Sequence, residues 1–442
     1  MRKHWKVLVG LVLVFGLVAA ACGDDEATTT TQAATTTTVA PTTTVATTTT
    51  EAPTTTEAPT TTTAPVVPLL VWADETRVPI IEAVAADFEA ATGVPVEIEL
   101  VGFGDIRANM VQQAPLGEGA DVFIGAHDWI GELVVNGVVE PIELGSRATE
   151  FFNVALDAFS YEGQRYGLPY AIEAIGLYRN TTLVPDAPAT FEDLLAICDE
   201  LGDAVTQCLA LPAGADAYHH YPFLASTGGY IFAWDGASYD PADVGLDNEG
   251  ALAGFDFFNG LVADGYLDPA VDYGTMTNLF FNNQAAFMWT GPWALPDVKA
   301  AVEAGTLSGY ATSPLPAILG NPAAPFVGVQ GFMVNAFSEQ KALAQTFVLD
   351  YIATADVMAQ LYEVGLRAPA HIEAFNAVAS DPDVQAFGES ASAGNPMPNV
   401  PEMASVWDAL GTAVQEIYNQ TSDAATALTT AAETVRAAIA GG

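Results

Sequence analysis

Five aromatic residues stand beside turns or polar clusters rather than inside apolar stripes: Trp129, Tyr218, Tyr221, Trp293 and Trp407. Asp or Glu residues are close neighbours of several of them. A pyranose stacks its apolar face on an aromatic ring, and its hydroxyl edge donates hydrogen bonds to carboxylates. Core packing is the alternative for any single tryptophan. Taken as a set, these residues favour recognition of a neutral, hydroxyl-rich ligand.

Two further tryptophans have a different setting. Trp72 lies in the short apolar run 68–73, and Trp289 lies in the run 286–290. Both runs are typical of buried strands, so both rings are predicted to belong to the hydrophobic core.

The chain carries no recognisable catalytic motif. None of its histidines has the spacing of a His-Glu-x-x-His or Cys-His metal site, and neither a Gly-x-Ser-x-Gly elbow nor a Gly-x-x-x-x-Gly-Lys phosphate loop occurs. Catalysis, a bound metal and a cofactor are therefore not predicted. Carboxylates are numerous, so a glycoside hydrolase or transglycosylase that uses a carboxylate pair stays open as the alternative.

The charge balance narrows the ligand class further. The 442 residues include 54 Asp+Glu and 12 Lys+Arg, which gives a formal net charge of −42, yet only 15% of residues are charged and 50% are hydrophobic. Nucleic-acid binding is excluded, because it requires Lys and Arg to displace counterions from phosphates. Docking to an anionic membrane through a basic face is excluded for the same shortage of cations. Scarce Arg also disfavours anionic ligands, so a neutral ligand is expected.

The N-terminal 66 residues have a composition unlike the rest. Residues 1–21 combine a basic start with a 15-residue apolar run, 7–21, which is typical of a secretory signal peptide. A short membrane anchor is the alternative, although about 20 apolar residues are needed to cross a bilayer. Residues 22–66 are rich in Thr, Ala and Pro and are predicted to form an extended tether.

Two cysteines remain in the part that should fold. Cys198 and Cys208 form an even pair in a chain with an export signal, which predicts a disulfide. Two free buried thiols are the alternative. Metal binding is disfavoured, because two Cys without nearby His supply too few ligands.

The folded part reads as alternating strands and helices. Strands are expected at 68–73, 94–101 and 121–125, with helices from Pro79 to Gly93 and over 105–113. This order predicts an α/β fold with a parallel sheet, in which ligands bind at the carboxyl ends of strands. Residues 74–77 and 126–129 follow two of these strands. Further helices are expected at 191–201, 250–264 and 277–282, and strands at 286–290 and 325–335.

Several motifs together resemble the maltose/maltodextrin-binding proteins of ABC importers, which are extracellular solute-binding proteins of the family 1 type. The resemblance runs from about residue 69 to the C-terminus. It is carried by the runs Ala126-His127-Asp128, Tyr170-Ala171-Ile172-Glu173, Thr290-Gly291-Pro292-Trp293, Pro325-Phe326-Val327-Gly328-Val329 and Met397-Pro398-Asn399-Val400-Pro401. In addition, residues 18–23 resemble a bacterial lipobox, in which Cys22 would become the lipidated N-terminus.

The resemblance implies a set of ligand-binding residues. Asp128 and Glu173 match carboxylates that accept sugar hydroxyls, whereas Tyr218, Trp293 and Trp407 match rings that stack on glucose units. The other positions implied are Asp74, Arg77, Trp129, Asp216 and Tyr273. Asp128 as a helix N-cap and Glu173 as a buried structural acid are the alternatives.

The resemblance also implies the architecture and the partners. Two lobes, 67–173 with 330–378 and 174–329 with 379–442, would close about hinge crossings near 171–175, 326–332 and 375–382. The protein would be a monomer, held at the cell membrane by its lipid, that captures maltose or maltodextrin and delivers it to a permease. Another neutral sugar such as trehalose is the alternative cargo.

The sequence departs from the family pattern at three positions. Gly125 replaces a stacking tryptophan, Trp129 replaces an arginine, and Gly411 replaces a second sugar-contacting arginine. The ring of Trp129 is expected to compensate for Gly125 from a neighbouring position. These departures leave the length and linkage of the sugar open.

Overall fold

The computed structural model describes residues 66–236 and 238–441. The predicted signal peptide, Cys22 and nearly all of the predicted tether lie outside these residues. Within the described ranges, no helix is both long and apolar enough to cross a membrane.

An eight-stranded mixed sheet holds the first strands of the described chain. β1 pairs in parallel with β2 and β3, as the strand–helix–strand order predicts, whereas β14 runs antiparallel to β3 and β7. The strands of this large sheet are β1 (Leu69–Ala73), β2 (Val96–Leu100), β3 (Val122–Ala126), β4 (Val139–Glu140), β7 (Leu168–Ala174), β14 (Phe326–Asn335), β15 (Ala368–Pro369) and β16 (Asn395–Pro396).

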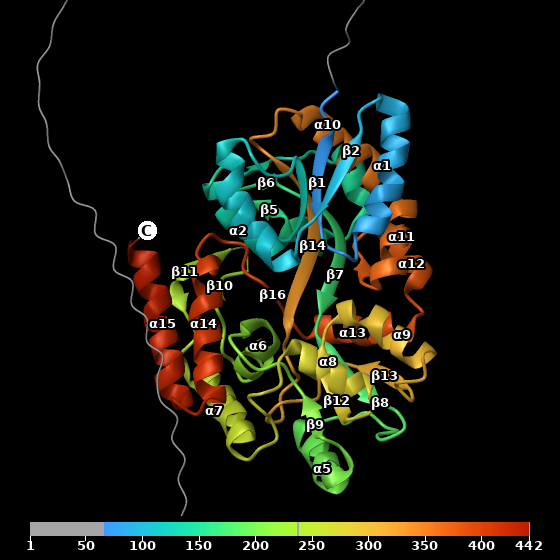
Figure 1. Cartoon of the computed structure of the whole chain (residues 1–442). Helices are drawn as coiled ribbons and strands as arrows, with labels where there is room; N and C mark the ends of the chain where they lie inside the picture. The colour runs from blue at the N-terminus through green and yellow to red at the C-terminus, as the bar shows by residue number, and fades with distance from the viewer. Residues whose placement is uncertain (1–65, 237, 442) are drawn as a thin grey trace, which may run out of the picture. The chain divides into compact units, whose positions relative to one another are not determined.

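A second, four-stranded sheet follows in the order β13-β8-β12-β9. Its strands are β8 (Gly176–Asn180), β9 (Gln207–Ala210), β12 (Ala285–Thr290) and β13 (Tyr310–Ser313). Only Ile175 separates β7 of the large sheet from β8 of this small sheet. Figure 1 shows β7 and its partner β14 running side by side from the large sheet toward the small one.

Two hairpins complete the strands of the described residues. β5 (Ser160–Tyr161) pairs with β6 (Gln164–Arg165), and β10 (Phe232–Trp234) pairs with β11 (Tyr239–Val244). The sequence reasoning did not predict either hairpin.

The helices begin and end where local chemistry favours it. α1 has a Pro in its first turn and ends at Gly93, whose φ of 73° is the left-handed conformation that glycine adopts most readily. The α-helices are α1 (Val78–Thr92), α2 (Phe103–Gln113), α3 (Ile130–Val135), α4 (Asn153–Ala158), α5 (Phe191–Leu201), α6 (Ala217–Ala225), α7 (Glu249–Ala263), α8 (Tyr273–Phe281), α9 (Leu295–Glu303), α10 (Lys341–Thr346), α11 (Ala355–Gly365), α12 (Ile372–Val378), α13 (Pro382–Ser392), α14 (Met403–Tyr418) and α15 (Ala424–Gly441). Shorter turns are η1 (Ala114–Leu116), η2 (His127–Trp129), η3 (Gly145–Glu150), η4 (Gly202–Ala204), η5 (Pro292–Ala294) and the π-type η6 (Phe347–Ile352).

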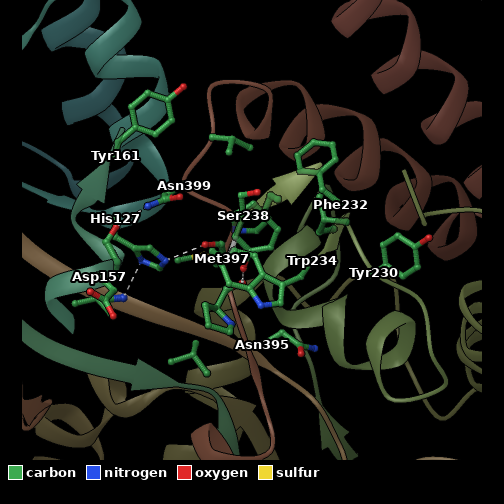
Figure 2. Close-up of a pocket in the computed structure, with 18 of the residues that line it drawn as sticks. His127, Asp157, Tyr161, Tyr230, Phe232, Trp234, Ser238, Asn395, Met397 and Asn399 are labelled. Atoms are coloured by element: carbon green, nitrogen blue, oxygen red, sulfur yellow. Dashed lines mark hydrogen bonds between the residues drawn. The ribbon is translucent and has the colours of Figure 1, made fainter. Parts of the chain in front are cut away.

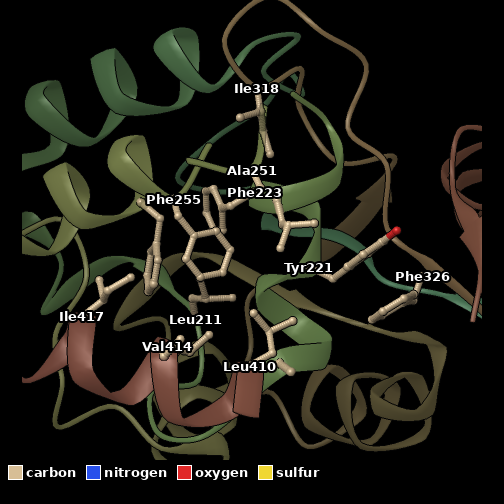
Figure 3. Close-up of a cluster of buried hydrophobic side chains, with 14 of the residues drawn as sticks. Leu211, Tyr221, Phe223, Ala251, Phe255, Ile318, Phe326, Leu410, Val414 and Ile417 are labelled. Carbon is tan, nitrogen blue, oxygen red and sulfur yellow. The ribbon is translucent and has the colours of Figure 1, made fainter. Parts of the chain in front are cut away.

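Each sheet packs its own hydrophobic core. Trp72 is buried in the core of the large sheet and Trp289 in that of the small sheet, as predicted. Figure 3 shows the small-sheet core, where the rings of Tyr221 and Phe326 stack with centroids 3.5 Å apart. At its edge, a disulfide joins Cys198 on α5 to Cys208 on β9. The protein therefore has a mixed α/β fold built around two sheets.

Candidate functional site

The loop after β1, residues 74–77, is held together by the side chain of Asp74. Asp74 Oδ1 accepts hydrogen bonds from the Thr76 backbone N–H and hydroxyl, at 3.1 and 2.9 Å. Asp74 also forms an ion pair with Arg77, and both side chains are buried. Arg77 Nε donates to the Tyr170 hydroxyl at 2.6 Å, which connects this strand end to β7. The loop is thus pre-shaped by its own polar groups.

A second buried ion pair lies on β7 itself. Arg367, just before β15, donates from Nε to Glu173 Oε2 at 2.9 Å, and Gln330 on β14 donates from Nε2 to Glu173 Oε1 at 2.8 Å. Burial acts to lower the pKa of Arg367, but Tyr170, Glu173 and Asp74 outweigh it and raise that pKa above its ordinary value. Arg367 therefore keeps its charge, and its ion pair with Glu173 is shielded from water.

Two polar atoms beside this pair have no hydrogen-bond partner among the described residues. They are the buried Tyr218 hydroxyl and Gln330 Oε1. A Cβ at Gly328 would be in ordinary van der Waals contact with Glu173 Cγ, at 3.4 Å, and with the Tyr218 hydroxyl oxygen, at 3.6 Å, so these two side chains approach the same point of β14. Buried polar groups are normally paired, so this donor and this acceptor mark a place for a polar ligand.

A wall of aromatic rings extends from Tyr218. Its ring centroid lies 5.9 Å from that of Trp293 and 5.9 Å from that of Phe326. Phe326 in turn lies 5.7 Å from Trp407 of α14. Trp407 Nε1 then donates to Asp128 Oδ2 at 3.2 Å, so the wall reaches the end of β3.

Asp128 is the acidic residue whose ionisation is most clearly disfavoured. It follows β3 within η2, and its side chain is buried. Burial raises the pKa of Asp128 to about 6, although Arg107 and Trp407 act to lower it. No side-chain cap from Asp128 is found at η2 or α3, so the N-cap alternative does not describe this residue.

The remaining predicted residues of the small-sheet side surround His219. Asp216 is the N-cap of α6 and accepts from the His219 backbone N–H at 3.0 Å. Tyr273 opens α8, is 39% exposed, and has its ring centroid 6.2 Å from that of His219. Trp293 lies at a similar distance from His219, 5.9 Å.

Trp129 is placed apart from the other predicted rings. It is buried in the core of the large sheet, with its centroid 4.9 Å from that of Phe103. A Cβ at Gly125 would come within 2.5 Å of the Trp129 ring, so a larger residue at 125 cannot coexist with this ring position. Trp129 thus fills the space beside Gly125, and its neighbour Phe103 packs under the guanidinium group of Arg77.

Five residues at the site were missed by the sequence reasoning: Tyr170, His219, Phe326, Gln330 and Arg367. Tyr170 and Phe326 stand inside the motifs that carried the resemblance, but no role was predicted for either. Arg367 could have been predicted, because the chain has only 12 Lys+Arg and this arginine stands in an apolar stretch. A cation buried there needs an acidic partner. Gln330 and His219 had no signal beyond their positions.

A separate cavity of about 1310 Å³ lies on the other face of β14 (Figure 2). Val327 and Val329 line it, whereas Gly328 and Gln330 border the Glu173 cluster, as strand alternation requires. In Figure 2 the His127 ring points to the Met397 carbonyl, which accepts from Nε2 at 3.0 Å. Of the five aromatic residues singled out in the sequence, only Tyr221 lines this rear cavity, and none of the predicted acidic ligand contacts does.

The site combines aromatic faces with hydrogen-bonding groups of both kinds. The carboxylates of Asp128, Glu173 and Asp74 accept, the Tyr218 hydroxyl donates, and both guanidinium groups are already paired with carboxylates. In the described ranges, no three His, Cys, Asp or Glu side chains are grouped to hold a metal ion. The arrangement suits stacking and hydrogen bonding to a neutral polyhydroxy ligand.

Comparison with known proteins gives a consistent result. Residues 83–386 match the model of a family described as bacterial extracellular solute-binding protein. The chain is 30% identical to a maltotriose-binding protein of Pyrococcus abyssi over 73% of this chain and 71% of that relative. It is 29% identical to a galactooligosaccharide-binding protein of Bacillus subtilis, over 84% and 89% of the two chains. It is also 26% identical to a maltooligosaccharide ABC transporter solute-binding lipoprotein of Streptococcus pneumoniae, over 85% and 89%.

Proposed function

The chain belongs to the family of bacterial extracellular solute-binding proteins, and we propose that its solute is a neutral oligosaccharide of the maltooligosaccharide type. It is a binding protein, so the carboxylate-pair hydrolase considered as the alternative is set aside.

One observation carries the choice of ligand. The buried Tyr218 hydroxyl and Gln330 Oε1 have no hydrogen-bond partner in the described part of the chain, and they lie near Glu173 and near the rings that include Trp293 and Trp407. A sugar hydroxyl both donates and accepts, so one hydroxyl is able to accept from Tyr218 and donate to Gln330 or Glu173. The rings would take the apolar faces of successive sugar units.

The names of the relatives indicate a class of ligand but do not identify one sugar. Two of the proteins compared are named for maltotriose and maltooligosaccharide, and one for galactooligosaccharide. The shared chemistry is a short, uncharged chain of hexoses. We assign α-linked glucose units as the first choice and galactose-containing or trehalose-type sugars as the alternative cargo.

Capture is proposed to proceed by closure of two lobes, 67–173 with 330–378 and 174–329 with 379–442. Two contacts between the proposed lobes support closure. Trp407 of the second lobe donates a hydrogen bond to Asp128 of the first, and Tyr218 of the second lies beside Glu173 of the first. A ligand that contacts residues of both lobes stabilises the closed arrangement. The ligand-binding set would be Asp74, Arg77, Asp128, Glu173, Tyr218, Tyr273, Trp293 and Trp407, with Asp216 and Trp129 behind the contact surface.

Calorimetric titration of the purified chain tests this proposal. We expect heat of binding with maltose, maltotriose and maltoheptaose, and none with glucuronate, whose carboxylate would meet the acidic residues of the site. Galactooligosaccharide and trehalose, titrated in parallel, assign the cargo. If no neutral saccharide binds at millimolar concentration, the proposed solute class is wrong.

The proposal extends to anchoring and delivery. One relative is named as a lipoprotein of an ABC transporter, and Cys22 follows a lipobox-like stretch. The mature protein would be a lipidated monomer that presents its sugar to a membrane permease. Detergent phase partitioning of the expressed full chain tests the anchor. The wild type should enter the detergent phase and Cys22→Ala the aqueous phase, whereas equal partitioning of the two would refute lipidation at Cys22.

A further inference from the structure

A chain of hydrogen bonds runs behind the aromatic wall. His219 Nδ1 lies 2.7 Å from Asp216 Oδ2, and His219 Nε2 lies 3.2 Å from Thr290 Oγ1. Asp216 is ionised: burial acts to raise its pKa, but the interactions with His219 outweigh burial and hold that pKa well below its ordinary value. An ionised carboxylate only accepts, so Nδ1 carries the proton. In the neutral imidazole, Nε2 then accepts from the Thr290 hydroxyl.

This histidine is fixed from three sides. Its backbone N–H donates to Asp216 Oδ1 at 3.0 Å, and its carbonyl accepts from Trp289 Nε1 at 3.2 Å. Its side chain is held at both nitrogens, and the residue is only 7% exposed. A ring with so many directional contacts has one orientation available.

The His219 ring also touches three of the aromatic residues assigned to the ligand. Its centroid lies 5.8 Å from Tyr218, 5.9 Å from Trp293 and 6.2 Å from Tyr273. The ring planes of Tyr218 and Trp293 are nearly perpendicular to the imidazole plane, at 75° and 85°. The His219 imidazole therefore limits how far either aromatic ring can tilt.

We propose that His219, locked by Asp216 and Thr290, is a positioning residue that sets the spacing and tilt of the stacking rings Tyr218 and Trp293. The inference rests on the proposed sugar-binding function and deepens it. His219 does not touch the ligand; it fixes the rings that do. Stacking on a pyranose depends on the ring face being presented at the right angle, so loss of the lock weakens binding without removing any contacting group.

The same reasoning assigns a distinct role to Asp216. Both of its oxygens are engaged by His219, one by the backbone N–H and one by the ring. It therefore orients the imidazole and caps α6 rather than serving as a main contact to the sugar.

Variants of His219 and Thr290 test the proposal. H219F keeps a planar ring of similar size but breaks both side-chain hydrogen bonds. H219N retains a donor near the Nδ1 position, and T290V removes only the hydroxyl. T227V is the matched control, because Thr227 is a partly buried threonine of the same proposed lobe whose hydroxyl donates to the Gly250 carbonyl at 2.7 Å.

Titration with maltotriose is expected to give a graded result. H219F should bind at least tenfold more weakly, H219N should recover part of that loss, and T290V should bind about three- to tenfold more weakly. T227V should bind like the wild type. The double variant H219F/T290V should bind no more weakly than H219F, because the two residues act through one lock.

A spectroscopic measurement separates positioning from general destabilisation. The indole N–H signal of Trp293 in a ¹H–¹⁵N spectrum should shift in H219F and T290V, and stay in place in T227V, under conditions where all variants are folded. Wild-type affinity in H219F, or additive losses in the double variant, would overturn the proposal. If the wild type binds no saccharide, the proposed function fails; the Trp293 signal then decides the positioning role alone, and an unshifted signal in H219F rejects it.

Discussion

Trp407 Nε1 donates a hydrogen bond to Asp128 Oδ2 across 3.2 Å, joining residues 279 positions apart in the chain. Trp407 belongs to α14, which packs on the core of the small sheet, whereas Asp128 follows β3 of the large sheet. The bond therefore connects the two halves of the fold at the candidate site. It also brings an aromatic ring and a carboxylate together, which is the combination that a sugar requires.

Binding should depend on the ionisation of Asp128. Burial raises its pKa to about 6, so the carboxyl is largely protonated at pH 5 and ionised at pH 7. Sugar hydroxyls donate to the ionised form and lower its pKa, so affinity should rise with pH by up to about tenfold between pH 5 and pH 7. Calorimetry at pH 6 in buffers of different ionisation enthalpy should detect proton release.

Asp128→Asn is the control for this pH dependence. The amide cannot ionise, so any remaining binding should be flat between pH 5 and pH 7. A wild-type affinity that does not change over this range would assign the contact to another group.

The two functions of the Trp407 side chain can be separated. Trp407→Phe keeps a stacking face and loses the donor to Asp128, so we expect a few-fold weaker binding. Trp407→Ala loses both and should bind at least tenfold more weakly, since about 1.4 kcal/mol corresponds to a factor of ten. Titration with maltotriose measures both variants.

Trp234 offers the matched control. It lies on β10 at the rear cavity, 55% exposed, on the other face of β14 from the site. Trp234→Phe should leave sugar affinity unchanged. Equal losses for Trp234→Phe and Trp407→Phe would mean that the front cluster is not the stacking surface.

The strand ends were predictable because periodicity and turn residues identify strands independently of tertiary context. The apolar runs before Asp74 and Asp128 predicted β1 and β3, and parallel pairing brings the carboxyl ends of such strands to one edge. The mixed character of the sheet was not predictable in this way. β14 comes from residues 326–335, and its antiparallel pairing with β3 depends on long-range packing that no local pattern encodes.

The hydrogen-bond network was the least predictable part of the site. The family resemblance implied that Asp216 is an acidic contact to the ligand. In the structure both of its carboxylate oxygens accept hydrogen bonds from His219, three residues later. Likewise, Trp129 reads as a ring available to a ligand, but the missing side chain of Gly125 lets it pack into the core. Both outcomes depend on the space that neighbouring side chains leave, which is a property of the folded packing.

The buried pair Glu173–Arg367 should matter for stability as well as for binding. Glu173→Gln removes the charge that compensates a guanidinium that is almost fully buried, so we expect the free energy of unfolding to fall by about 3–5 kcal/mol. Arg367→Met should have a similar effect. The double variant should lose less than the sum of the two, because neither charge is then left alone. Urea unfolding at pH 7 measures all three.

An exposed pair provides the comparison for this prediction. Arg147 and Asp350 form an ion pair at 3.5 Å with both side chains partly open to solvent. Asp350→Asn should change stability by about 0–1 kcal/mol. Additive losses at Glu173 and Arg367, or a loss no larger than that of Asp350→Asn, would show that the buried pair is not coupled.

Two buried histidines should make the fold sensitive to mild acid. Burial lowers the pKa of His127 and of His220 to about 4, and both rings have hydrogen bonds that suit the neutral form. Between pH 6.5 and pH 4 the unfolded chain binds more protons at these residues than the folded chain does. Their contribution to stability is therefore full above pH 6.5 and falls as the pH is lowered toward 4.

The ionisation of Asp128 affects stability in the opposite direction to the histidines, and over almost the same pH range. Its raised pKa of about 6 means that the folded state holds a proton which the unfolded state has lost, so its contribution to stability falls as pH rises from 4 to 6. Each of these groups changes the free energy of unfolding by up to about 1.4 kcal/mol per pH unit. The two histidines and the opposing aspartate together therefore leave a net slope of about 1.4 kcal/mol per pH unit. Asp128→Asn removes the opposing group and should steepen that slope toward about twice this value. Urea unfolding of both proteins at pH 4.5, 5.0, 5.5 and 6.0 measures the slopes, and a variant slope equal to or shallower than the wild type would contradict the burial of Asp128 as the cause.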